Sequence, residues 1–185
     1  MAELGLSELL LSPAEAEGLS APGGTDAAVL LALYDYPETS RLVFTKRRID
    51  MRRHAGEISF PGGRRDHPDE ALMTTALREA EEEVGLDREA VTVAGALPPV
   101  GTFVTGYKVH PFVGTVAEEP KLTPNPGEVA EILILGLDEL RAGYAMRRLV
   151  RRGIPIRTPT YDVGDHTIWG ATARILGDLL QRLDA

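Results

Sequence analysis

Three glutamates near the middle of the chain, Glu79, Glu82 and Glu83, have the spacing of metal ligands on a helix. From about residue 69 to residue 84 the apolar residues recur with helical period, and Gly85 marks the end. Residues three and four apart return to one helix face, so the three carboxylates are predicted to share an arc of about 100°, each half exposed. Like charges crowded in this way repel one another. A divalent cation such as Mg²⁺, which prefers carboxylate oxygens, removes that cost.

Two neighbouring residues are assigned different roles. Arg78 lies next to Glu82 on the helical wheel, where its guanidinium can orient that carboxylate through a charge-assisted hydrogen bond. Glu81 points to another side and is expected to be solvated. An acidic run of this kind is also typical of an ordinary surface helix, so the spacing alone leaves that alternative open.

The charges around this helix are unevenly distributed. Seven basic residues and two acidic ones lie from Lys46 to Arg65, whereas six acidic residues and one arginine lie from Glu79 to Glu89. This order suits a phosphate-rich ligand that is held partly by arginines and partly through a divalent cation. Two solvated faces of opposite sign are the alternative.

The elements that position these residues are strands mixed with a few helices. Strands are expected at 27–34, 41–46, 56–60, 91–97, 107–117 and 129–135, with a strand pair near 154–168, and helices at 69–84, 137–143 and 171–183. The strand at 56–60 is expected to stop at Pro61-Gly62-Gly63. The mixture predicts an α/β fold, an α/β/α sandwich with a mixed β-sheet between helices. Residues 1–24 are expected to form a helical lead-in, and residues 25–185 a single domain.

Composition narrows the class of protein further. The chain has 185 residues, of which 43% are hydrophobic, and a net charge of −8, which opposes bulk binding to nucleic acid or to an anionic membrane. It has no cysteine, which excludes disulfides and thiolate chemistry, and no apolar run long enough for a membrane span. These features predict a cytoplasmic protein without a nucleic-acid or membrane partner.

The sequence around the glutamates resembles the Nudix box. That box runs glycine, five residues, glutamate, seven residues, then Arg-Glu-aliphatic-x-Glu-Glu-x-Gly-aliphatic, and this chain has Gly63 followed by Arg-Glu-Ala-Glu-Glu-Glu-Val-Gly-Leu at 78–86. Asp69 keeps the spacing from Gly63 and Glu70 keeps the spacing to Arg78, so the loop carries one inserted residue and the two acids compete for one role. The resemblance implies the Nudix fold and hydrolysis of a diphosphate linkage attached to a nucleoside.

A second resemblance narrows the substrate. Residues 42–47 and 53–63, including Phe60-Pro61-Gly62-Gly63, look like the segment that precedes the box in coenzyme A diphosphatases, and the likeness continues through about residue 175. It implies cleavage of coenzyme A or its thioesters to 4′-phosphopantetheine and adenosine 3′,5′-bisphosphate. A Nudix pyrophosphatase acting on another nucleoside diphosphate derivative, such as ADP-ribose, is the alternative. Arg48 departs from this branch, where a small residue is more usual.

The resemblance also implies roles for individual residues. Mg²⁺ or Mn²⁺ would be held by Glu79, Glu82, Glu83 and the carbonyl of Gly63. The substrate's phosphates would be met by the close backbone approach that Gly62 and Gly63 allow and by three candidate arginines, which are Arg47, Arg53 and Arg64. Glu79 and Glu128 are both candidates for the general base.

A second basic cluster stands apart from the box. It consists of Arg147, Arg148, Arg151 and Arg152, and it is expected to be a solvated patch. Contact with a substrate or with a partner subunit is the alternative, so a homodimer is kept among the possible assemblies.

Overall fold

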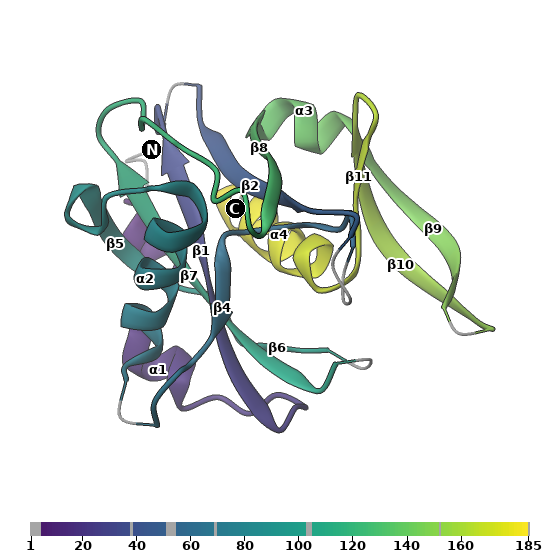
Figure 1. Ribbon diagram of the computed structural model, residues 1–185, viewed down its shortest axis with the longest axis horizontal. Helices are drawn as coiled ribbons and strands as arrows, with labels where there is room; N and C mark the ends of the chain where they lie inside the picture. Colours follow the sequence, from purple (N-terminus) through teal and green to yellow (C-terminus); the bar gives the residue numbers. More distant parts are fainter. Residues whose placement is uncertain are drawn as a thin grey trace.

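A mixed sheet of eight strands lies between two long helices. The structure is a computed structural model that describes residues 5–37, 39–50, 55–68, 70–102, 105–151 and 153–184. Helix α2 (Leu72–Val84) covers one face of the sheet and α4 (Gly170–Leu183) covers the other (Figure 1). The predicted α/β/α sandwich is therefore confirmed.

Strand β1 (Thr25–Tyr34) forms the centre of the sheet. It pairs in parallel with β7 (Tyr107–Val116) along its whole length, and antiparallel with β2 (Arg41–Arg47) and β4 (Gly62–Arg64). The remaining strands pair antiparallel with these neighbours: β5 (Val91–Ala96) and β6 (Val100–Gly101) with β7, and β3 (Ile58–Ser59) and β8 (Val129–Gly136) with β2. The sheet is thus mixed, as predicted.

The two apolar cores follow from the alternation of side chains along β1. Leu31 and Leu33 point into the cluster that includes α4, whereas Leu30, Ala32 and Tyr34 point into the cluster beneath α2. Because β1 is buried on both faces, its sequence is a nearly continuous apolar run rather than an alternating one. Helix α2 packs on this strand and is thereby fixed above the centre of the sheet.

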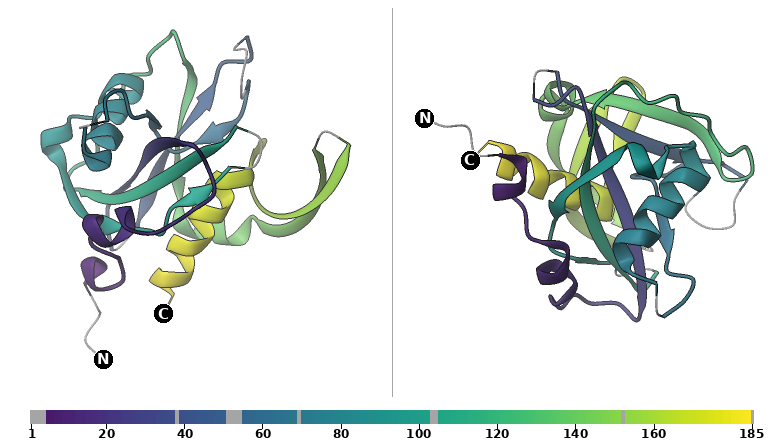
Figure 2. Two further views of the ribbon diagram at one scale, coloured as in Figure 1. Left: turned by 90° about the horizontal axis from the view of Figure 1, so that it is seen from below. Right: turned by 90° about the vertical axis from the view of Figure 1, so that its left-hand side faces the viewer.

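A second sheet extends from the C-terminal half. After α3 (Leu137–Ala142), strands β9 (Tyr144–Arg151) and β10 (Ile154–Val163) form a long hairpin, and β11 (His166–Ile168) adds a third strand. The hairpin curves away from the main sheet (Figure 2, left). Strand β9 was not predicted, because its arginines and exposed positions resemble a basic loop, and only pairing with β10 makes it a strand.

Two local predictions differ from the structure. The lead-in is helical only over η1 (Leu6–Glu8) and α1 (Pro13–Glu17), and it packs on the body through the buried side chains of Leu6 and Ala16. The expected strand at 56–60 is shorter, and Pro61 does not end pairing, because β4 resumes it beside β1. No helix among the described residues is long and apolar enough to cross a membrane.

Candidate active site

Helix α2 places the predicted carboxylates beside β4. It buries Leu72, Ala76, Ala80 and Val84 against the sheet, and it ends at Gly85, whose φ of 68° is the left-handed conformation that glycine adopts without strain. The glutamates occupy its last two turns. This is the helix predicted from the periodicity, although it begins at residue 72 rather than 69.

The three glutamates differ sharply in exposure. The side chain of Glu83 is 6% exposed and that of Glu79 is 17% exposed, whereas that of Glu82 is 56% exposed. The expectation that all three are half exposed is therefore wrong. The helical wheel gives the direction of each side chain, but β4 covers one end of the arc and leaves the other open.

Glu83 is held in a buried position between two strands. Its Oε2 accepts a hydrogen bond of 3.1 Å from the backbone N–H of Gly62, and its Oε1 lies 3.6 Å from Arg47 Nη1 at the end of β2. Burial raises the pKa of Glu83 to about 7, although the Gly62 hydrogen bond and the Arg47 charge oppose this shift. A carboxylate with this pKa gains from a nearby cation.

Glu79 is packed directly against Gly63. A Cβ atom added at Gly63 would lie 2.4 Å from the carboxylate carbon of Glu79, so only glycine leaves room for this side chain. Burial raises the pKa of Glu79, while the hydrogen bond and charge of Arg78 lower it. Gly62 is equally restricted, because its Cβ would lie 2.3 Å from the backbone oxygen of Ala28. The two glycines thus serve the protein's own packing.

Arg78 connects the acids of this region. Its Nε donates to Glu70 Oε1 at 3.0 Å, and its Nη1 donates to Glu79 at 2.9 Å and to Glu82 at 3.3 Å. The predicted contact between Arg78 and Glu82 is confirmed. Glu70 also accepts from the hydroxyl of Thr75, and the Arg78 hydrogen bond lowers the pKa of Glu70. Of the two acids that compete for one role, Glu70 makes the arginine contact, and Asp69 lies outside the described residues.

A loop before β8 brings Glu128 to the same place. Glu128 Oε2 lies 3.6 Å from Arg47 Nη2, so Arg47 stands between Glu128 and Glu83. Arg48 holds this loop: its Nη1 donates to the Pro126 carbonyl at 2.6 Å, and its backbone N–H donates to the Glu128 carbonyl at 3.1 Å. Asp50 in turn binds the Arg48 guanidinium through both carboxylate oxygens. Sequence reasoning missed the contact between Arg48 and the Pro126 carbonyl, since these residues lie far apart in the chain.

The other predicted residues are placed as follows. Arg64 has an exposed side chain, and its carbonyl accepts from Arg78 at 3.2 Å. The side chain of Glu81 is 39% exposed and pairs with Arg88, away from the carboxylate group, as expected for a residue outside the site. Arg53 lies outside the described residues.

The chemistry of the acids suits a hard divalent cation, but their arrangement is not that of a complete metal site. No three His, Asp or Glu side chains in the described ranges converge as a ligand group. Arg78 supplies the positive charge between Glu79 and Glu82. Glu79 and Glu83 are desolvated carboxylates, and the charge of Glu79 adds to the raised pKa of Glu83. Two such carboxylates beside the Gly63 backbone fit Mg²⁺ or Mn²⁺, which complete their shells with waters and substrate phosphates.

The fold and this carboxylate helix define a Nudix hydrolase, and comparison with known proteins agrees. The NUDIX domain model matches residues 24–153, so the chain belongs to the Nudix family. The Nudix hydrolase NudL of Pectobacterium atrosepticum, described as uncharacterized, is 39% identical over 158 residues, which cover 83% of this chain and 80% of the relative. NudL of Photorhabdus laumondii is 40% identical over 159 residues, covering 85% and 84%. The protein is therefore a pyrophosphatase of the class that acts on nucleoside diphosphate derivatives.

Solved structures show the same fold. The Nudix hydrolase RenU of M. smegmatis superposes with a TM-score of 0.53 at 25% identity, covering 67% of this chain and 76% of its own. A MutT protein from Methanosarcina mazei has a TM-score of 0.53 at 20% identity and covers 90% of this chain and 96% of its own. The second likeness supports the architecture alone.

Proposed function

We propose that this enzyme cleaves the diphosphate linkage of coenzyme A or its thioesters to 4′-phosphopantetheine and adenosine 3′,5′-bisphosphate. The observation that carries the proposal is a groove of about 830 Å³ at the end of β2, lined by Lys46, Arg47 and Arg48 together with Asp50 and Glu131. Arg47 joins the groove to the carboxylate helix through its contact with Glu83. A substrate with a diphosphate and a separate 3′-phosphate needs cationic groups at more than one point, and guanidinium groups bind phosphate strongly.

The proposed chemistry uses residues from three elements. Glu79, Glu83 and the Gly63 carbonyl would hold Mg²⁺ or Mn²⁺, and Glu82 would be a further ligand. The ion would supply neutralisation of the diphosphate charge and a lower pKa of a bound water. Arg47 orients the diphosphate. Water attacks one phosphorus, and the bond from that phosphorus to the bridging oxygen breaks.

Glu128 is the favoured general base, and it takes the proton of the attacking water. It lies on a loop that faces Arg47, and its side chain is 49% exposed. The other candidate, Glu79, is bound by Arg78 and packed against Gly63, which restricts its freedom to accept a proton. A cytoplasmic location, a small-molecule substrate and the absence of nucleic-acid or membrane partners remain part of the same proposal.

The test compares coenzyme A, dephospho-coenzyme A and ADP-ribose at saturating Mg²⁺. A hydrogen bond to a charged group contributes about 1.5–3 kcal/mol, so loss of the 3′-phosphate should lower kcat/KM about ten- to hundred-fold. Because Arg47 lies beside Glu83, Arg47→Ala should lower kcat/KM for coenzyme A and dephospho-coenzyme A alike. EDTA should abolish activity, and Mg²⁺ or Mn²⁺ should restore it. Equal efficiencies on the first two substrates, or a preference for ADP-ribose, would refute the assignment to coenzyme A.

A further inference from the structure

The two arginines of the groove at the end of β2 are already engaged by neighbouring groups. The Arg48 guanidinium donates hydrogen bonds of 2.6 to 2.9 Å to Asp50 and to the Pro126 carbonyl. The Arg47 guanidinium lies 3.6 Å from a carboxylate of the helix α2 and 3.6 Å from that of the loop before β8, which is the place proposed above for the diphosphate. A further phosphate on the same ligand therefore needs another cation.

Lys46 is the remaining cation of this groove. Among the described residues its ammonium has one ionic contact, with Glu131 Oε2 at 3.8 Å, which is longer than a hydrogen bond. The two side chains are 34% and 48% exposed, and ion pairs with that exposure contribute little to stability. A lysine ammonium binds phosphate as a compact point charge with three donors. Lys46 can therefore leave Glu131 for a stronger anion at little cost.

Lys46 serves a different side of the sheet from Arg47. Arg47 contacts Glu83 of α2, whereas the partner of Lys46, Glu131, lies 4.0 Å from Nε2 of His166 on β11 in the second sheet. This division is expected, because successive residues of a strand point to opposite faces. The two cations are thus offered to separate parts of one ligand, while both line the same groove.

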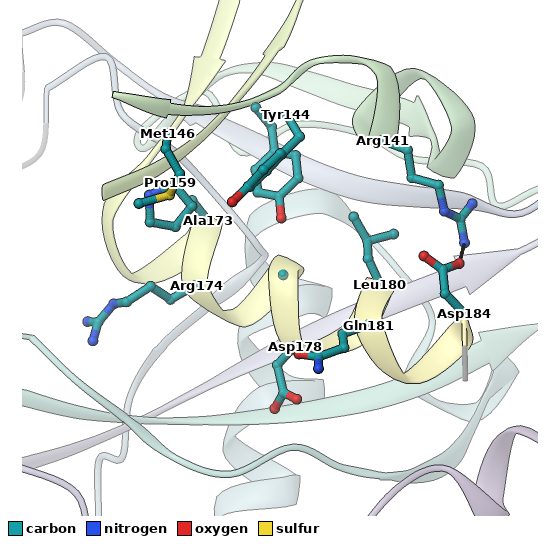
Figure 3. A pocket seen from close by; sticks show the side chains of 12 residues that line it. Arg141, Tyr144, Met146, Pro159, Ala173, Arg174, Asp178, Leu180, Gln181 and Asp184 are labelled. Carbon is teal, nitrogen blue, oxygen red and sulfur yellow. Dashed lines mark hydrogen bonds and ion pairs between the residues drawn. The ribbon is translucent and has the colours of Figure 1, made fainter. Parts of the chain in front are cut away.

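The second groove of the described structure is less suited to a phosphate. It has a volume of about 840 Å³ and lies between α4 and the β9–β10 hairpin (Figure 3). The arginines that line it are Arg141, which pairs with Asp184, and Arg174, which donates to a backbone carbonyl of β6 at 2.6 Å. Arg148 and Arg157 face each other on the hairpin but line neither groove.

We propose that Lys46 binds the 3′-phosphate of coenzyme A and thereby distinguishes coenzyme A from dephospho-coenzyme A, an inference that rests on the proposed function. Arg47 holds the diphosphate on the α2 side of the strand, and Lys46 receives the separate phosphate on the other side. On binding, the Lys46 ammonium exchanges Glu131 for phosphate oxygens. Glu131 opposes this exchange, because its carboxylate competes for the lysine and repels the phosphate.

The test measures kcat/KM for coenzyme A and dephospho-coenzyme A on each variant. Wild type should prefer coenzyme A about ten- to hundred-fold. In Lys46→Ala the ratio should fall to about 1, because coenzyme A loses a contact that dephospho-coenzyme A never makes. Lys46→Arg keeps the charge and should retain most of the preference. Lys108→Ala is the matched control: it removes the same charge from β7, outside the groove, and should leave the wild-type ratio.

Two further measurements separate the role of Lys46 from general damage. Glu131→Gln should act in the opposite direction and raise the preference for coenzyme A about threefold. Calorimetric titration gives a readout without turnover, in which Lys46→Ala should weaken binding of adenosine 3′,5′-bisphosphate about tenfold and leave that of AMP as in wild type. Equal efficiencies of wild type on the two substrates would refute the proposed function itself. A wild-type preference that persists in Lys46→Ala would overturn the role of Lys46 alone.

Discussion

Alanine at Gly62 and at Gly63 should damage the protein in two different ways. Neither glycine has a positive φ, so alanine is compatible with both backbones, and the outcome depends on what each new Cβ meets. At Gly63 it would lie 2.4 Å from the carboxylate of Glu79, which is the end of a flexible side chain. At Gly62 it would lie 2.3 Å from the Ala28 oxygen and 2.7 Å from the Val29 Cα, which belong to the central strand.

The magnitudes follow from these neighbours. Ordinary contact needs at least 3.4 Å, so Gly63→Ala must displace the Glu79 carboxylate by about 1 Å, and a misplacement of that size costs about 100-fold in rate. Glu79 can move, so the loss of stability should stay near 1 kcal/mol, at the low end for overpacking. Gly62→Ala must separate β4 from β1 instead, which should cost about 3 kcal/mol or more of unfolding free energy.

The assays are urea denaturation and kcat at saturating Mg²⁺ for each variant. Gly24→Ala is the matched control, because its Cβ would meet nothing within 4 Å and it should resemble wild type in both assays. Wild-type kcat in Gly63→Ala would show that the position of Glu79 against this backbone does not matter for turnover. Wild-type stability in Gly62→Ala would contradict the close approach of β4 to β1.

Three further predictions concern other parts of the molecule. Glu82→Gln should lower kcat about 10- to 100-fold, as loss of a metal-site contact does, while Glu81→Gln stays near wild type; equal loss in both would refute the helical-face assignment. Arg48→Ser removes the hydrogen bond from Arg48 to the Pro126 carbonyl and should free the Glu128 loop. We expect kcat to fall about 5-fold, equivalent to ~1 kcal/mol, with the melting temperature nearly unchanged. An unchanged kcat would show that Arg48 does not position Glu128. Burial lowers the pKa of His110 below 6.5, so stability that is present above pH 6.5 should be lost as the pH falls below it. In His110→Gln the free energy of unfolding, measured by urea denaturation, should depend less on pH than in wild type. An equal pH dependence in both proteins would show that the His110 imidazole does not cause it.

The site was predictable from sequence where its geometry is local. Periodicity and Gly85 identify α2, and three-four spacing identifies the contact between Arg78 and Glu82. The unequal exposure of the glutamates was not predictable, because it depends on β4, which lies beside β1 only in the folded sheet. The glycines of β4 resemble a turn in the sequence, yet they are strand residues chosen for close approach to a neighbouring backbone and side chain.

Long-range contacts explain what the sequence reasoning missed. The resemblance treats Arg48 as a departure from the usual small residue, and nothing near it in the chain suggests a partner. Its partner, the Pro126 carbonyl, reaches it because β2 and β8 are paired neighbours in the sheet. Strand β9 was missed for a similar reason, since its register is set by β10 and not by its own pattern of apolar residues.

The guanidinium of Arg78 makes two groups of contacts, one with the loop before α2 and one with the carboxylates of α2. Nε donates to Glu70, and Nη2 donates to the Arg64 carbonyl, so that side of the group is tied to the loop before α2. Nη1 alone faces Glu79 and Glu82. The hydrogen bond to Glu70 is the largest cause that raises the pKa of the Arg78 guanidinium. Because the contacts with Glu70 and the Arg64 carbonyl use Nε and Nη2, they remain if Glu79 or Glu82 turns away from Nη1. A divalent cation bound at Glu79 and Glu82, as proposed above, would compete with one nitrogen of an arginine whose other contacts keep it in place.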